Sequence, residues 1–312
     1  MRFMMMVKSD SRSEAGVLPD SKLLTRMTAL NEEMVSAGVM LGGEGLKPSA
    51  QGVRVRSSGK RVSVVDGPFT EARELVGGFW LVETASLAEA VAWAKRVPFE
   101  GGEIEIRALY EMSDFPPDAA ATPDGGSDEE RAAREAGTPS SSAAPPSAAP
   151  PAAPARQPGT TRFVALLKAD RVTESGVLPT TKALEEMGAL MDELAASGRL
   201  LGGEGLKPSA RGARVRFAGD RRTVIDGPFT ETKELIAGYS MIQVPSKEEA
   251  VDFAKRWLKV HLGMSAEPLE SGEIEIRAVM EPEDFGPAVP GDGAQVGGWR
   301  EREQKLRERL GG

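Results

Sequence analysis

The chain contains the same domain twice, and this duplication constrains its fold more than any other feature of the sequence. The nonapeptide GGEGLKPSA begins at Gly42 and again at Gly202, an offset of 160 residues. The same offset relates the two DGPFTE hexapeptides, which begin at Asp66 and Asp226. A third repeated segment, GEIEIRA, recurs with an offset of 170, so the second copy has about ten extra residues. The nonapeptide is therefore one segment of a duplicated domain.

The duplication divides the chain into four segments. Copy one is expected at residues 1–115 and copy two at residues 161–286. Residues 116–160 are rich in Pro, Ala and Ser and have few large apolar side chains, which predicts a disordered linker. Residues 287–312 form a charged tail with the spacing of a helix. We expect a frayed, solvated helix there, with a docked helix as the alternative.

The composition excludes several functions. A net charge of −8 disfavours binding of nucleic acid, which requires concentrated Lys and Arg. The chain has no cysteine and one histidine, so we expect no disulfide, no metal site, no cofactor and no Ser-His-Asp triad. The apolar start MRFMMM is too short for a signal peptide, and no apolar run approaches the ~20 residues of a membrane span. We expect a cytoplasmic protein with no membrane partner.

Periodicity predicts the order β-α-β, a hairpin, and β-α-β in each copy, which is a ferredoxin-like βαββαβ unit with an inserted hairpin. In copy one, residues 2–8 (RFMMMVK) are apolar on both faces, as in a central strand. A helix is expected from about Ser21 to Ala37, with Gly38 as its left-handed C-cap. A second helix should begin after Ser86, with Glu89 completing a capping box.

Such a sheet has helices on one face only, so its other face requires a cover. The sister copy offers a matching apolar face. We therefore predict an α+β protein whose two ferredoxin-like domains pair as an intrachain dimeric α+β barrel, a pseudo-dimer within one chain.

The glycine-rich nonapeptide does not fit a phosphate loop. Pro48 follows its lysine, and the next segment has the pattern of a strand rather than a helix. Two interpretations remain open. The glycines permit positive φ or close backbone packing. Alternatively, this segment lines a ligand cleft with Glu44 and Lys47, and with Glu204 and Lys207 in copy two.

The DGPF motif has the composition of a turn, but its aspartate lacks the usual turn hydrogen bond. The residue two positions after Asp66 is Pro68, which has no N–H to donate. A cap to the N–H of Phe69 or Thr70 remains possible. Alternatively, the carboxylates of Asp66 and Asp226 face a cleft as general bases or polar anchors.

Other candidates flank these motifs. The ends of the central strands and the segments after DGPF carry the charged residues Lys8, Asp10, Lys168, Asp170, Glu71 and Glu231. Each is either a ligand-binding residue or a member of an ordinary surface ion pair. His261 lies in the insertion of copy two, where we expect it on the surface of a helix extension.

The DGPFTE segment, following GGEGLKPS in a ferredoxin-like order, resembles the YCII-related family and its DGPF branch. The resemblance covers residues 1–115 and 162–285. It implies a dimeric α+β barrel and, from the better-known branch, a catalytic histidine–aspartate pair. The aspartate would correspond to Asp66 and Asp226, whereas Lys22 and Lys182 stand where the histidine is expected. The resemblance also implies a link to an extracytoplasmic-function sigma factor.

Two hypotheses follow. In the first, each repeat has a small-molecule cleft, and the protein is a binding protein or an enzyme that uses Asp66 and Asp226. In the second, the protein is a non-catalytic regulator or scaffold linked to a sigma factor. A partly buried Asp66 beside a pocket favours the first hypothesis. A solvent-facing Asp66 that caps a turn, together with an exposed apolar patch elsewhere, favours the second.

Overall fold

The structure, a computed structural model, describes residues 1–59, 61–69, 75–115, 157–229, 234–266 and 268–285, together with residues 302, 305, 306, 309 and 310. The predicted linker lies almost entirely outside these ranges, as do Glu71 and Glu231. Residues 1–110 and the chain from residue 153 onward belong to one compact unit, which contains both copies.

The two copies contribute the same elements in the same order. Copy one supplies β1 (Arg2–Lys8), α1 (Ser11–Glu14), α2 (Ser21–Ser36), β2 (Met40–Gly45), β3 (Val53–Ser58), β4 (Arg61–Asp66), β5 (Val76–Glu83), α3 (Leu87–Lys95) and β6 (Gly101–Ala108). Copy two supplies β7 (Thr161–Lys168), α5 (Arg171–Ser175), α6 (Thr181–Ala196), β8 (Leu200–Gly205), β9 (Ala213–Ala218), β10 (Arg221–Asp226), β11 (Ile236–Val244), α7 (Lys247–Leu262) and β12 (Ser271–Ala278).

The predicted helix ends are confirmed. Helix α2 ends at Ser36, and Gly38 follows with φ +69°, the left-handed conformation that glycine adopts without strain. The Ser86 side chain accepts the N–H of Glu89 at the start of α3. The short helices α1 and α5 were not expected, and their N-caps are Asp10 and Asp170.

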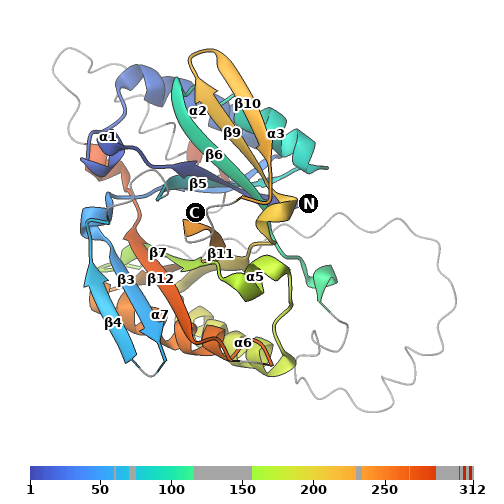
Figure 1. Cartoon of the computed structure of the whole chain (residues 1–312). Coiled ribbons are helices and arrows are strands. Elements are labelled where there is room, and N and C mark those ends of the chain that lie inside the picture. Colours follow the sequence, from blue (N-terminus) through green and yellow to red (C-terminus); the bar gives the residue numbers. More distant parts are fainter. Residues whose placement is uncertain are drawn as a thin grey trace, which may run out of the picture. The chain divides into compact units, whose positions relative to one another are not determined.

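Each sheet contains four strands of one copy and a hairpin of the other. The strand orders are β10-β9-β6-β1-β5-β2 and β4-β3-β12-β7-β11-β8, with every neighbouring pair antiparallel. The inner four strands, β6-β1-β5-β2 and β12-β7-β11-β8, have the ferredoxin-like order. Figure 1 shows β3 and β4 of copy one beside β12 of copy two, where Val53 pairs with Ile276 and Ser58 with Ser271. The predicted hairpin therefore exists, but it completes the sister copy's sheet.

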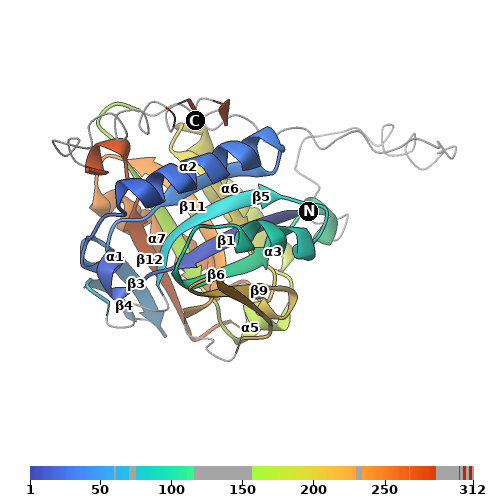
Figure 2. The ribbon, with the colours of Figure 1, turned by 90° about the horizontal axis from the view of Figure 1, so that it is seen from above.

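Both faces of the sheets are covered, as the fold prediction required. Helices α2 and α3 lie over one face of the first sheet, and Figure 2 shows them above β1, β5 and β6. A separate core joins the two copies through Met4 and Met6 of β1 and Val164 and Leu166 of β7. The ring centroids of Phe79 and Tyr239 lie 5.9 Å apart in the same core. The predicted α+β fold, with its two ferredoxin-like repeats paired within one chain, is confirmed.

Three residues of the tail, Arg302, Leu306 and Leu310, pair or pack with the rest of the protein, so the expectation of a solvated tail is wrong for these three. Leu306 is only 3% exposed, and Leu310 packs against the core that includes α2 residues. The guanidinium of Arg302 lies 2.6 Å from Glu32 on α2. Leu306 and Leu310 are four residues apart, the spacing that places two side chains on one face of a helix.

The hairpin exchange predicts that the two copies are one folding unit. Cleavage at a protease site introduced near Ser140 should leave the halves associated on gel filtration, because separation would strip two strands from each six-stranded sheet. A fragment of residues 1–115 alone should be unfolded or should pair with a second copy of itself. Two stable halves that migrate independently would contradict the exchange.

Candidate functional site

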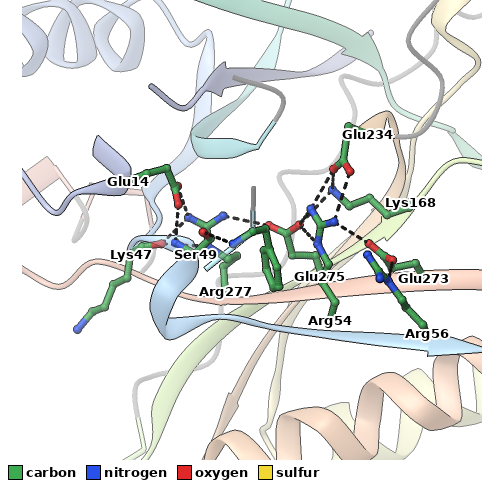
Figure 3. Close-up of polar contacts among 11 residues, drawn as sticks. Glu14, Lys47, Ser49, Arg54, Arg56, Lys168, Glu234, Glu273, Glu275 and Arg277 are labelled. Carbon is green, nitrogen blue, oxygen red and sulfur yellow. Dashed lines mark hydrogen bonds and ion pairs between the residues drawn. The ribbon is translucent and has the colours of Figure 1, made fainter. Parts of the chain in front are cut away.

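A buried network of charged side chains lies where the exchanged hairpin meets its host sheet (Figure 3). Arg54 of β3 pairs in register with Glu275 of β12. Their neighbours Val53, Ile274 and Ile276 belong to the core beneath the helices. Because side chains alternate along a strand, Arg54 and Glu275 point to the opposite face, toward the sister sheet.

The contacts in this network are close and shared. Arg54 Nε donates to Glu275 Oε2 at 2.9 Å, and Arg54 Nη2 lies 3.0 Å from Glu234 Oε2. Lys168 Nζ lies 2.7 Å from Glu234 and 3.2 Å from Glu275. All four side chains are buried. Each cation therefore contacts more than one carboxylate, which offsets part of the cost of removing the charges from water.

The electrostatics keep Glu275 ionised although its side chain is fully buried. Burial by itself raises the pKa of Glu275, but Lys168, Arg277 and Arg54 together lower it to about 2. Burial likewise raises the pKa of Glu234, and Lys168 and Arg54 reverse this, leaving it below its ordinary value. Both groups are carboxylates at neutral pH.

A second branch of the network reaches the nonapeptide of copy one. Arg277 Nη1 lies 3.0 Å from Glu275, and Arg277 Nη2 lies 3.1 Å from Glu14. Arg277 Nε donates to the carbonyl of Lys47 at 3.0 Å. Glu14 in turn accepts the N–H of Ser49 at 2.9 Å. The network thus joins a strand of copy two to a helix and a loop of copy one.

The sheet of copy one has a corresponding network. Lys8 Nζ lies 3.1 Å from Glu105, and Arg214 of the exchanged hairpin lies 2.8 Å from the same carboxylate. Arg107 contacts Glu105 at 3.2 Å and Glu174 at 3.0 Å. Burial raises the pKa of Glu105, but Lys8, Arg107 and Arg214 lower it to about 2.

The DGPF motif supports the network. The guanidinium of Arg54 lies 4.2 Å from the ring centroid of Phe69, a cation–π contact. The N–H of Phe69 donates to Ser49 Oγ at 3.1 Å. A side-chain carbon at Gly67 would lie 1.8 Å from the carbonyl oxygen of Ser49, so only glycine fits. Gly67 and Pro68 are joined by a cis peptide bond. The motif therefore packs one loop onto another and places Phe69 on Arg54.

The nonapeptide glycines also allow close packing. Gly43 lies within β2, where a side-chain carbon would approach Trp80 Cδ1 to 2.9 Å. At Gly52, just after the nonapeptide, such a carbon would lie 2.8 Å from Arg277 Cδ. The packing interpretation is thereby supported for Gly43, whereas a side-chain carbon at Gly42 would meet nothing within 4 Å. Lys47 reaches the network through its backbone carbonyl.

Asp66 and Asp226 lie at the ends of β4 and β10, and both are exposed. The Asp66 carboxylate is 72% exposed and lies 2.8 Å from Lys247 Nζ at the start of α7. In the β3–β4 register Asp66 pairs with Val53, so the two share the helix-facing side, opposite to Arg54. The role of these aspartates as base or anchor stays a prediction.

The other predicted residues divide into four groups. Lys8 and Lys168 belong to the networks, whereas Asp10 and Asp170 cap α1 and α5. The nonapeptide residues form ion pairs or ring contacts: Glu44 with Arg162, Glu204 with Arg2, Lys47 with Asp284, and Lys207 Nζ 5.9 Å from the ring centroid of Tyr110. Glu71 and Glu231 lie outside the described residues.

The expectation of a surface position for His261 is wrong. His261 lies on α7 and is 3% exposed, with Nε2 2.8 Å from Asp170 Oδ2. Helix α7 has 16 residues where α3 has 9, so the insertion extends the helix and brings its last turn to the end of β7. This position differs from the start of the first helix, where the resemblance places the family's histidine.

Sequence reasoning missed the network because it treated the charged residues of each strand separately. The segment VRVR in β3 and the segment EIEIR in β12 and β6 alternate apolar and charged residues, with opposite signs. Two strands with complementary charges on one face are suitable partners. This complementarity of charge could have predicted that Arg54 pairs with a glutamate at the position of Glu275 or Glu105.

A polar groove of about 520 Å³ opens beside the network of the second sheet. It is lined by three cations (Arg54, Arg56 and Lys168), three carboxylates (Asp170, Glu234 and Glu273) and three serines (Ser57, Ser58 and Ser271), with Ala169 and Gly272. Among the described residues, no cluster of His, Asp and Glu could hold a metal ion. In the same part of the chain, no helix has the length and apolarity to cross a membrane.

The depressed pKa values predict acid sensitivity. The pKa of Glu105 and of Glu275 is about 2 in the folded protein, below their ordinary value of 4.5. Their stabilisation is therefore complete above about pH 5 and is lost as the pH falls from 4.5 toward 2. Urea unfolding at pH 7, 4 and 3 should show a free energy of unfolding that has decreased by about 2 kcal/mol per carboxylate at pH 3, most of the roughly 3 kcal/mol that a shift of this size represents. A flat profile would contradict the geometry.

A matched pair of variants tests the network itself. Glu275→Gln leaves three buried cations without their shared charge and should lower the free energy of unfolding by about 3–5 kcal/mol. Glu273→Gln, on the same strand but partly exposed, should lower it by about 1 kcal/mol or less. Equal losses measured by urea unfolding would contradict the assigned burial.

Comparison with known proteins agrees with the duplicated architecture. The model of the YCII-related domain matches residues 1–113 and, separately, residues 161–281. An uncharacterised protein of Rhizobium meliloti is 31% identical over 102 residues, which cover 31% of this chain and 82% of that protein. Neither comparison concerns a sigma factor, so that link remains untested. The two matches cover most of the chain, and each corresponds to one of the two repeats seen in the sheets. The chain therefore belongs to the YCII-related domain family, of which it carries two copies in tandem.

Proposed function

We propose that the protein binds a small polar molecule of no net charge in the polar groove of the second sheet. The observation that carries this proposal is the charge balance of the lining. Three cationic side chains face three carboxylates, so the formal charges cancel.

Each cation of the lining is already paired. Arg56 forms an ion pair with Glu273, and Arg54 and Lys168 share Glu234 and the buried Glu275. A ligand with a net charge would lose hydration without meeting an excess of the opposite charge. A ligand with both donors and acceptors, such as a polyol or a zwitterion, can exchange its hydrogen bonds to water for bonds to this lining.

Two hydroxyl groups favour the second sheet over the first. At the positions that correspond to Ser58 and Ser271, the hairpin and strand of the first sheet carry Ala218 and Gly101, which have no hydroxyl. The volume of the polar groove lies within the usual range of small-molecule sites. A matching cleft in the first sheet stays a prediction.

No reaction is assigned in this proposal. The sequence suggested Asp66 and Asp226 as anchor or general base, but the exposed Asp66 carboxylate lies on the other side of the sheet from Arg54. A catalytic role for the two aspartates would require a ligand on the helix-facing side of the hairpins. The test below therefore includes both aspartates.

The proposal predicts selective stabilisation by neutral ligands. Melting temperatures should be measured with the polyol sorbitol, zwitterionic amino acids, dicarboxylates and diamines at equal ionic strength. At a concentration of 100 Kd a neutral binder stabilises the folded state by about 2.7 kcal/mol, which raises the melting temperature by a few degrees. Charged compounds should have no comparable effect at neutral pH.

Matched variants locate the binding. Ser271→Tyr should fill the polar groove and abolish the shift. Gly101→Tyr at the corresponding position of the first sheet, where a side-chain carbon meets nothing within 4 Å, should retain it. The double variant Asp66→Asn with Asp226→Asn should also retain it. Loss of the shift in the double aspartate variant alone would reject the polar groove and support the aspartates.

A further inference from the structure

His261 lies directly beneath the lining of the polar groove, next to Asp170 and Gly272. Asp170, which lines the groove, accepts the N–H of Val172 at 2.8 Å and of Thr173 at 2.9 Å through Oδ1. Its other oxygen lies 2.8 Å from His261 Nε2. A side-chain carbon at Gly272, another lining residue, would lie 3.5 Å from His261 Cδ2. The imidazole therefore lies immediately beneath the groove, separated from it by Asp170 and a glycine.

The surroundings of His261 leave Asp170 as its ionisable contact among the described residues. Strands β3, β7, β11 and β12 present the apolar core of the second sheet to α7. The charged residues Lys168, Arg54, Glu273 and Glu275 point to the other face of that sheet. The start of α6 lies near the end of α7, since the N–H of its N-cap Thr180 donates to the carbonyl of Met264, and its charged residues Lys182, Glu185 and Glu186 are exposed. Further along α6, Glu193 pairs with Arg256 at the surface, and Lys259 of α7 itself is exposed.

The proton on this pair changes the charge of the lining. With a neutral imidazole, the polar groove has three positive and three negative groups. With an imidazolium, the charge of Asp170 is compensated from behind, and the groove carries one net positive charge. Imidazole is the side chain that changes charge between pH 5 and 8, and the chain has one histidine and no cysteine.

We infer that His261 determines which charge class of ligand the polar groove accepts: neutral polar molecules when its imidazole is neutral, and monoanions such as a hydroxy monocarboxylate when it is protonated. This inference rests on the proposed function. Copy one has no histidine, so the first sheet has no equivalent of His261. The specificity of the polar groove thus arises from the insertion that lengthens α7.

The test uses two probes that differ at one carbon. Sorbitol is a neutral polyol, and gluconate has a carboxylate in place of one terminal alcohol. Binding of both to the full chain should be measured by calorimetry at pH 8.0 and pH 5.5. Gluconate should bind about tenfold more tightly at pH 5.5, the scale of one added unit charge across a partly solvated site. Sorbitol affinity should change less than about twofold.

A variant and a spectroscopic measurement separate the causes. His261→Gln keeps a side-chain N–H near Asp170 but cannot take a proton, so the pH dependence of gluconate binding should disappear while sorbitol binding remains. In the wild type, the single imidazole resonance can be followed directly by NMR. Because linkage is reciprocal, gluconate should raise its titration midpoint by about one pH unit, whereas sorbitol should not move it.

The outcomes are distinguishable. Sorbitol binding with pH-independent gluconate binding, or a pH dependence that persists in His261→Gln, overturns the inference and leaves the proposed function standing. An unchanged imidazole titration with saturating gluconate overturns it in the wild type, even if the variant fails to fold. Absence of binding by both probes at both pH values overturns the proposed function and this inference together.

Discussion

The contact between an arginine of one copy and a buried glutamate of the other is the constraint on which the rest of the structure depends. Arg54 meets Glu275, and Arg214 meets Glu105, each across the join between exchanged hairpin and host sheet. A carboxylate with no exposed surface requires cations close by, and part of that charge comes from the sister copy. Neither sheet is therefore complete, electrostatically or in its strand number, without both halves of the chain.

The repeated sequence segments follow from this constraint. DGPF supplies the aromatic ring on which the arginine lies, and the nonapeptide supplies a carbonyl and a hydroxyl that hold Arg277 and Phe69. These segments are identical in the two copies because both joins need them. The copies differ within the join, at Ser57 against Phe217, and outside it, in the insertion that contains His261. The charged side chains of the two joins are therefore the same in both copies, whereas their uncharged neighbours differ.

The sequence predicted what is local and failed on what depends on the partner. Strand periodicity, the glycine after α2 and the serine cap of α3 act within a few residues, and the structure has them where they were expected. The exchange of hairpins was not predictable, because β3 of copy one meets the same GEIEIRA sequence in either copy. The burial of His261 and Leu306 also depends on surfaces that form only after folding. Asp66 was singled out for a hydrogen bond it lacks, whereas Arg54 and Glu275 were passed over because their partners are distant in sequence.

Because the two joins have the same charged side chains, these charges cannot by themselves choose between pairing within a chain and pairing between chains. Arg54 would find an equivalent glutamate in copy two of its own chain or of a neighbour. Covalent connection favours pairing within one chain. It holds the two copies together at an effective concentration that separate chains do not reach. Fusion then permits divergence that a homodimer cannot reach, because only one of two physically joined copies has to change. The placement of His261 beneath a single groove is a difference of that kind.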